Sequence, residues 1–97
     1  MFNNARYCTA GIANAVPLCI QAILWGLVDN MAVDEKDYFQ VFRLSKYDGK
    51  QRIVHEQEVP EYKKIHDIPL CNAAPVIGKI YVIDSNTYST MLFADEY

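Results

Sequence analysis

The dipeptide Asp48-Gly49 constrains the fold of this chain more than any other feature, because it stands between two runs that are typical of β-strands. Residues 37–45 and residues 51–59 are both rich in aromatic and β-branched side chains. Asp-Gly between such runs is one of the strongest signals for a two-residue hairpin turn. The sequence therefore predicts a β-hairpin in which Tyr47 faces Lys50 across the turn.

This register predicts which side chains lie opposite one another. It pairs Phe42 with His55, and it brings Arg43 within reach of Glu56 on the diagonal. We expect Arg43 and Glu56 to form an ion pair on one face of the hairpin, whereas His55 points to the other face. Pro60 ends the second strand, because proline cannot donate to a strand ladder.

Local patterns predict the other elements. A short strand is expected at residues 5–12 and a helix at residues 17–31, since Pro17 suits a first helical turn. A second hairpin is expected at residues 79–84 and 88–95. These elements lie on both sides of the first hairpin along the chain.

Between the two hairpins, residues 60–75 contain three prolines and no clean period. This segment predicts an irregular excursion with one short strand at residues 64–68. Runs of strands with one segregated helix are typical of α+β proteins. We therefore predict one α+β domain over residues 1–97: a mostly antiparallel sheet of about five strands, with one long amphipathic-to-apolar helix packed on one face.

The predicted helix is apolar on nearly all sides. Its main face carries apolar side chains at spacings of three and four, which are Ile20, Ile23, Leu24, Leu27, Val28 and Met31. The opposite side contains Gln21 and Asp29, but Leu18 and Trp25 lie close to them. We expect the main face to pack on the sheet and the second face to be available to another chain.

Composition and charge argue against several classes of protein. The formal net charge is -3, and Lys and Arg form no run, so we expect no nucleic-acid partner.

The most apolar stretch, residues 16–28, is shorter than the roughly 20 residues that a membrane-spanning helix needs. The first residues contain no apolar signal segment, and the three cysteines show no CxxC spacing. We therefore expect reduced thiols, a cytoplasmic location and no membrane partner.

The stretch from His55 to Asp67 holds both histidines of the chain and is the first candidate for a metal or acid–base site. The zincin pattern HExxH needs two histidines on one face of a helix. Here the next histidine is His66, and in a strand His55 and Glu56 point to opposite faces. We therefore predict a hairpin strand with a solvated acidic face, and no metal, cofactor or small-molecule ligand.

The cysteines are the candidates for nucleophilic catalysis. Cys8 in a strand and Cys19 in an apolar helix are predicted as core side chains, whereas Cys71 lies in a loop and is expected to be the most accessible. The serine motif GxSxG and the phosphate loop GxxxxGK[ST] are both absent from the sequence. We predict that the protein is not an enzyme. The alternative is a small metal- or thiol-dependent enzyme, whose candidate residues are His55, Glu56, His66 and Cys71.

Aromatic and apolar side chains outside the predicted core favour a binding role. Trp and Tyr are typical anchors of protein interfaces. The candidate interface residues are Leu18, Trp25, Phe39 and Tyr88. We therefore predict a non-enzymatic protein–protein interaction module or a homodimer. The alternative is a loosely packed monomer with scattered exposed apolar residues.

Several segments together resemble a known family. They are RYCTAGI, VPLCIQAILWGLVD, DYFQVFRLS, EQEVPEYKK and YVIDSNTYSTMLFADEY. The chain resembles the domain-of-unknown-function family nine-sixty, short uncharacterised proteins of low-GC Gram-positive bacteria and their mobile elements. The resemblance runs nearly end to end and implies a cytoplasmic, single-domain protein without an assigned activity. It leaves open a further alternative, an inhibitor protein linked to mobile elements.

Overall fold

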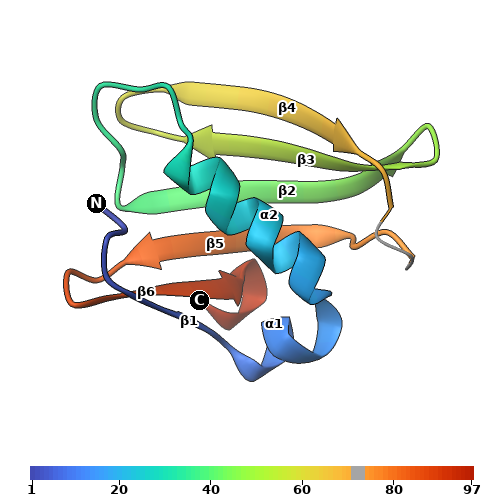
Figure 1. Ribbon diagram of the computed structural model, residues 1–97, viewed down its shortest axis with the longest axis horizontal. Coiled ribbons are helices and arrows are strands. Elements are labelled where there is room, and N and C mark those ends of the chain that lie inside the picture. Colours follow the sequence, from blue (N-terminus) through green and yellow to red (C-terminus); the bar gives the residue numbers. More distant parts are fainter. Residues whose placement is uncertain (71–73) are drawn as a thin grey trace.

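The computed structural model describes residues 1–70 and 74–97, and these residues form one six-stranded sheet with helices beside it. The elements in chain order are β1 (Ala5–Cys8), α1 (Ala10–Ala15), α2 (Leu18–Asp29), β2 (Phe39–Tyr47), β3 (Lys50–Gln57), β4 (Tyr62–Ile68), β5 (Gly78–Asp84), β6 (Tyr88–Phe93) and the 3-10 helix η1 (Ala94–Glu96). The strand order across the sheet is β1-β6-β5-β2-β3-β4 (Figure 1). The pair β1–β6 is parallel and all other neighbours are antiparallel.

The predicted fold class is wrong. We expected about five mostly antiparallel strands and one long helix, but the sheet is mixed, has six strands, and dominates the molecule. Among the helices within residues 1–70 and 74–97, α2 is the longest, with 12 residues, and α1 has six. The parallel pairing of β1 with β6 joins the two ends of the chain, so no local pattern could indicate it.

The segment predicted as one strand over residues 5–12 divides between β1 and α1. Thr9 makes the division, because its Oγ1 accepts a hydrogen bond from the backbone N–H of Ile12 at 3.2 Å. This N-cap interaction favours the start of a helix. Pro17 then separates α1 from α2, since proline lacks the N–H that a continuous helix needs.

The excursion predicted over residues 60–75 contains a full edge strand. All of β4 pairs with β3, from Tyr62 opposite Gln57 to Ile68 opposite Gln51. The short strand expected at residues 64–68 is therefore part of a longer one. The start of β4 was not recognised because the adjacent lysines Lys63 and Lys64 interrupt the alternation of apolar and polar residues.

The hairpin predicted from Asp48-Gly49 is confirmed. Both turn residues have positive φ, 52° and 71°, which is the geometry of a type I′ turn. Tyr47 faces Lys50, and the register that follows places Phe42 opposite His55, as expected. The predicted ion pair is also present, with Arg43 Nε 2.8 Å from Glu56 Oε1.

One face of the sheet is covered by α2 and holds the core (Figure 1). Three α2 side chains, Ile20, Leu24 and Val28, are buried there. They pack with apolar side chains of the strands, which are Phe42, Leu44, Ile53, Ile80, Val82 and Met91. Strand alternation sends the intervening side chains to the opposite face, here called the open face, which α2 does not cover.

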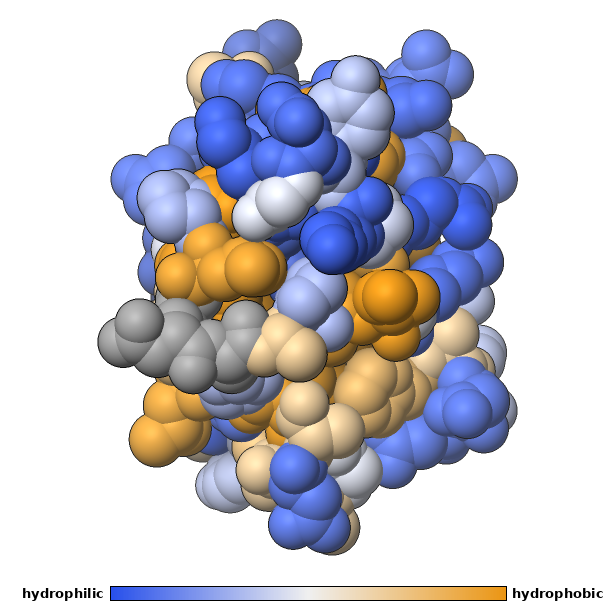
Figure 2. All heavy atoms as spheres, turned by 90° about the vertical axis from the view of Figure 1, so that its right-hand side faces the viewer, coloured by the Kyte–Doolittle hydropathy of each residue, from blue (hydrophilic) through white to orange (hydrophobic). Residues whose placement is uncertain are grey.

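At the end of the molecule that carries the β2–β3 turn, apolar side chains reach the surface in patches between hydrophilic ones (Figure 2). The apolar surface at this end is therefore broken up. Among the described residues, no helix has the length and apolar character needed to cross a membrane.

Candidate functional site

The open face carries a group of aromatic rings, here called the aromatic cluster: Tyr38, Phe39, Tyr81 and Tyr97. Alternation along β2 and β5 points Phe39 and Tyr81 to this face, where their ring centroids lie 4.7 Å apart. Tyr97 meets both rings edge-on, at 5.4 Å from Phe39 and 5.6 Å from Tyr81. Phe39 and Tyr81 are tilted relative to each other, and edge-to-face contacts such as those of Tyr97 are favourable for aromatic side chains.

The position of Tyr97 depends on η1. The Glu96 carboxylate accepts hydrogen bonds from the Phe93 backbone N–H and the Thr9 hydroxyl, both at 2.8 Å. These bonds hold the last turn of the chain against the start of α1. Tyr97 is nevertheless 76% exposed, so most of its ring surface faces solvent.

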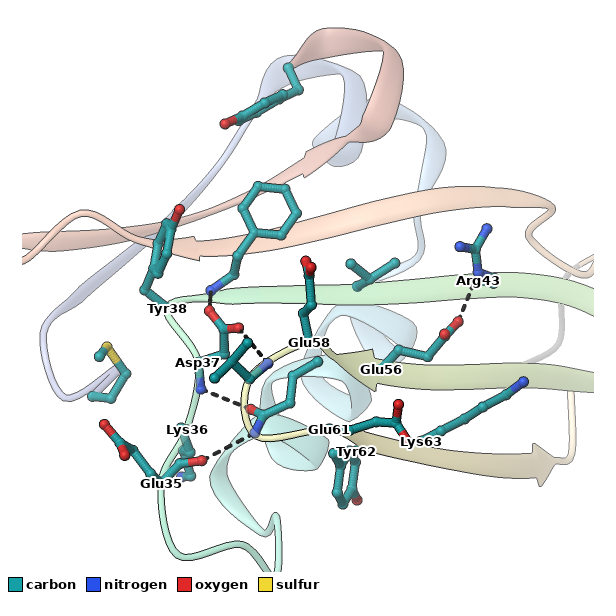
Figure 3. Close-up of a pocket in the computed structure, with 16 residues that line it drawn as sticks. Glu35, Lys36, Asp37, Tyr38, Arg43, Glu56, Glu58, Glu61, Tyr62 and Lys63 are labelled. Atoms are coloured by element: carbon teal, nitrogen blue, oxygen red, sulfur yellow. Dashed lines mark hydrogen bonds and ion pairs between the residues drawn. The ribbon is translucent and has the colours of Figure 1, made fainter.

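A hollow of about 1080 Å³ lies beside the aromatic cluster, between the start of β2, the end of β3 and the turn before β4 (Figure 3). Its rim carries three carboxylates that make no hydrogen bond or ion pair within the described chain: Glu35, Glu58 and Glu61. Two other carboxylates of the lining are occupied. Glu56 pairs with Arg43, and Asp37 accepts the backbone N–H groups of Phe39 and Val59. The hollow is therefore acidic on one side and aromatic on the other.

A chain of buried amides supports this hollow from the inner side. Gln57 donates to the carbonyls of Glu35 and Pro60, at 3.1 and 2.8 Å. Its Oε1 accepts from the Asp37 backbone N–H and from Gln40 Nε2, both at 2.8 Å. The loop before β2 and the turn after β3 are thus fixed to the sheet by one side chain.

His55 completes this chain of hydrogen bonds. Because Gln40 uses its amide nitrogen as a donor, its Oε1 must accept, and it lies 2.7 Å from His55 Nε2. Nε2 therefore carries the proton, and Nδ1, which has no partner in the described structure, is unprotonated. Burial, with a smaller contribution from His66, lowers the pKa of His55 to about 4, so the ring is neutral at pH 7. The ring stacks on Phe42 at 4.3 Å.

The four residues predicted as an interface do not share one surface. Leu18, on α2, is 80% exposed, and Trp25 is half-buried beneath the guanidinium of Arg6 at 4.7 Å. Phe39 and Tyr88 lie on the open face, where Phe39 joins the aromatic cluster. The sheet stands between the two pairs. Only Phe39 belongs to the hollow.

The sheet also determines where the candidate residues of the alternative enzyme lie. His55 and Glu56 point to opposite faces, as expected. His66 lies on the same face as His55, and burial lowers its pKa. Its Nε2 has no hydrogen-bond partner in the described structure. Cys71 lies outside the described residues. The prediction that Cys8 and Cys19 are core side chains is wrong, because both are exposed.

No group of three His, Cys, Asp or Glu side chains within residues 1–70 and 74–97 is arranged to hold a metal ion. The structural role of the glutamines was not predicted, although alternation from Ile53 places Gln51 and Gln57 on the inner face. The place of Tyr97 was not predicted either, because it depends on the contact between Glu96 and Thr9, which lie far apart in the sequence.

Comparisons with known proteins identify a family but no activity. A crystal structure of a protein of unknown function from Enterococcus faecalis is similar to this chain, with a TM-score of 0.86 at 21% sequence identity. The match covers 98% of this chain and 92% of that chain, and at this identity it shows the fold alone. No curated protein matches the chain.

The family resemblance noted in the sequence is confirmed. The model of the family described as "Staphylococcal protein of unknown function (DUF960)" matches residues 5–96. Because this match covers nearly the whole chain, the protein belongs to the DUF960 family.

Proposed function

We propose that this protein is a non-enzymatic binding module that holds a segment of a partner protein on the open face of its sheet. The observation that carries the proposal is the aromatic cluster, which lies on the uncovered face and not in the core. Exposed rings beside a hollow are typical anchors of protein interfaces. A partner segment would bury the ring surface that Tyr97 now leaves in water.

The charge of the hollow indicates the chemistry of that segment. Glu35, Glu58 and Glu61 line the rim without partners in the described chain, whereas the only lining lysines are Lys36 and Lys63. Lys36 already donates to the carbonyl of Asp29 at 3.3 Å. A partner that carries Arg or Lys complements this rim.

The aromatic cluster favours the same kind of partner. A cationic side chain above a Tyr or Phe ring gains about 0.5–2 kcal/mol from the ring quadrupole, depending on how far it is desolvated. We therefore assign the hollow to a segment in which Arg or Lys alternates with apolar residues. The positive side chains would meet the rim and the rings, and the apolar ones would cover Phe39 and Val41.

The position of His55 supports a non-enzymatic role. This side chain has no exposed surface and contacts Gln40, Phe42 and Tyr62 on the inner side of the sheet. A general base must reach the proton that it removes, and the sheet separates His55 from the hollow. An inhibitor protein linked to mobile elements would be one form of the proposed binding mode.

A fluorescence anisotropy titration with a labelled peptide of alternating Arg and Leu tests this proposal. We expect saturable binding to the wild type at low salt, and binding at least about fivefold weaker in Tyr97→Ala and in the Glu58→Gln/Glu61→Gln double variant. The control peptide replaces each Arg by Glu, and the control variant is Leu18→Ala, which removes an exposed side chain from α2.

Two results would contradict the proposal. One is equal binding of the Arg and Glu peptides. The other is an affinity that Leu18→Ala lowers as much as Tyr97→Ala does, because the contact would then lie on α2.

A further inference from the structure

The strand β4 forms one free edge of the sheet. It contains seven residues, Tyr62–Ile68, and within the described chain only β3 pairs with it (Figure 1). The other edge strand, β1, has four residues. The unpaired N–H and C=O groups of an edge strand are a template for a further strand, and β4 offers the longer template.

The hairpin geometry fixes which backbone groups of β4 point outward. In a two-residue hairpin the flanking pair, here Tyr47 and Lys50, is hydrogen-bonded. Hydrogen-bonded and non-bonded pairs alternate along an antiparallel ladder, so the next residue of β3, Gln51, turns its backbone groups toward β4. Four β4 residues therefore bond to β3, which are Tyr62, Lys64, His66 and Ile68. Three residues direct their backbone groups outward, which are Lys63, Ile65 and Asp67.

We propose that the protein forms a two-fold homodimer in which β4 pairs antiparallel with β4 of a second copy, with the symmetry axis at Ile65. In this register the outward backbone groups of Ile65 exchange hydrogen bonds with those of Ile65 in the second copy. The sheet then continues from one copy into the other. This inference does not depend on the proposed function, because it is argued from the edge strand β4 and not from the aromatic cluster, although Lys63 also lines the hollow.

The side chains on the open face are self-complementary in this register. Lys63 faces Asp67 of the second copy, and Asp67 faces Lys63 of the second copy, so two ion pairs flank the axis. At the axis two Ile65 side chains meet, each of which is 51% exposed in the single chain. Arg52 already binds Asp67 through two nitrogens, at 2.8 and 2.9 Å, and holds the pKa of this carboxyl below its usual range. Asp67 is therefore ionised and oriented before a second copy arrives.

The side chains on the inner face agree with the same register. Tyr62 faces Ile68 of the second copy, an aromatic and β-branched pair of the kind that stabilises antiparallel strands. Lys64 faces His66 of the second copy. Burial lowers the pKa of His66, so the imidazole is neutral at pH 7 and does not repel the lysine.

Lysines on an edge strand ordinarily oppose pairing with another chain. The register with the axis at Ile65 neutralises Lys63 with Asp67. An axis at Lys64 would place two lysines opposite each other, and an axis at His66 would place Ile65 opposite Asp67 without an ion pair. The charge pattern thus selects one register among its neighbours.

Sedimentation velocity of the wild-type protein between about 10 µM and about 1 mM tests the dimer. A single strand pair is a small interface, so we expect a dissociation constant on the order of 10 µM or weaker. Ile65→Glu would set two carboxylates face to face on the axis and should weaken association at least about tenfold. The matched control is Ile77→Glu, because Ile77 is an equally apolar exposed residue away from this edge and is 72% exposed. Thermal melts of both variants confirm that each is folded.

Amide hydrogen exchange identifies the interface without any substitution. We expect the amides of Lys63, Ile65 and Asp67 to exchange more slowly as the wild-type concentration rises. The amides of Lys64 and His66, which already bond to β3, should be protected at every concentration.

Two results would overturn the inference. The first is a monomer throughout the concentration range. The second is a dimer that Ile65→Glu weakens no more than Ile77→Glu does, or one in which the three outward amides gain no protection, because association would then use another surface.

Discussion

At the scale of single residues, glutamine side chains act in this protein as substitutes for backbone groups. An amide side chain offers a donor and an acceptor in nearly the geometry of a peptide bond. Gln51 uses both toward one residue: its Oε1 accepts from the Val76 N–H at 2.8 Å and its Nε2 donates to the Val76 carbonyl at 3.0 Å. Gln21 caps the end of α1 through the Val16 carbonyl. Glutamine side chains thus hold the segment at Val76 on the sheet and the end of α1 against α2.

The number of bonds that each glutamine makes predicts the cost of losing it. Gln57→Leu removes the acceptor of the Asp37 N–H, one of the two acceptors of Gln40 Nε2, and the donor to the Glu35 and Pro60 carbonyls, so we expect a loss of about 3 kcal/mol in the free energy of unfolding. Gln21→Leu removes one hydrogen bond and should cost about 1 kcal/mol. Urea denaturation of both variants measures the difference. If both variants lost the same free energy of unfolding, the larger number of hydrogen bonds made by Gln57 would not determine its contribution to stability.

His55 makes the stability depend on pH. Its pKa is about 4 in the folded protein and 6.5 in the unfolded chain. Between these values the unfolded chain binds a proton that the folded protein does not, so stability falls as the pH decreases from 6.5 toward 4. For this fully buried ring we expect a loss of roughly 2 kcal/mol between pH 6.5 and pH 5.

The variant His55→Gln removes this titration and keeps a side chain that can donate to Gln40. Urea denaturation at pH 7 and pH 5 should show a smaller decrease in stability for the variant than for the wild type. His66, whose pKa burial also lowers, contributes the remaining dependence in the same direction. A variant with the full wild-type decrease would contradict the assignment.

At the scale of secondary-structure elements, local chemistry explains what the sequence could predict. The β2–β3 hairpin follows from two residues that tolerate positive φ, and its register determines every pair up to Val41 and Glu56. The apolar face of α2 follows from periodicity, and its members Ile20, Leu24 and Val28 are buried. Both features depend on residues that are close together in the chain.

Two features near the start of the chain were not predicted. The helix α1 has only six residues, and its cap Thr9 also suits a strand. A strand was expected from residue 5, but its parallel pairing was not, because the partner β6 lies more than eighty positions away along the chain, as in the pair of Ala5 with Tyr88. The site was missed for the same reason, since Phe39 and Tyr97 meet only in the folded protein.

Two glycines of these elements give opposite predictions for the same substitution. Gly49 has φ +71° in the hairpin turn, so Gly49→Ala should lower the free energy of unfolding by about 1 kcal/mol. Gly26 lies within α2 and an added Cβ would meet no atom within 4 Å, so Gly26→Ala should raise it by about 0.5–1 kcal/mol. Thermal melting of the two variants measures both changes. If the melting temperatures shifted in the same direction, the explanation from the φ of Gly49 and the helix propensity at Gly26 would be contradicted.

At the scale of the whole molecule, the sheet separates a closed side from an open side. The closed side holds α2, the apolar core and the neutral His55. The open side holds the aromatic cluster and the acidic rim of the hollow (Figure 3). The free edge at β4 lies between the two sides, so a dimer formed there would extend the open face without covering it.

The two proposed contacts can be tested separately in one protein. Ile65→Glu should weaken self-association, whereas Tyr97→Ala should weaken binding of the peptide and leave self-association unchanged. Lys63 lies in both surfaces, so a substitution there would affect both contacts. For that reason the two test substitutions are at Ile65 and Tyr97.

An NMR titration of the isotopically labelled protein with the alternating Arg and Leu peptide tests the central claim most directly. We predict that the amide shifts of Phe39, Val41, Tyr81 and Tyr97 change in a saturable way, while those of α1 and α2 change little. Shift changes concentrated in α2, or none up to the highest peptide concentration, would contradict the claim that the open face is the binding surface.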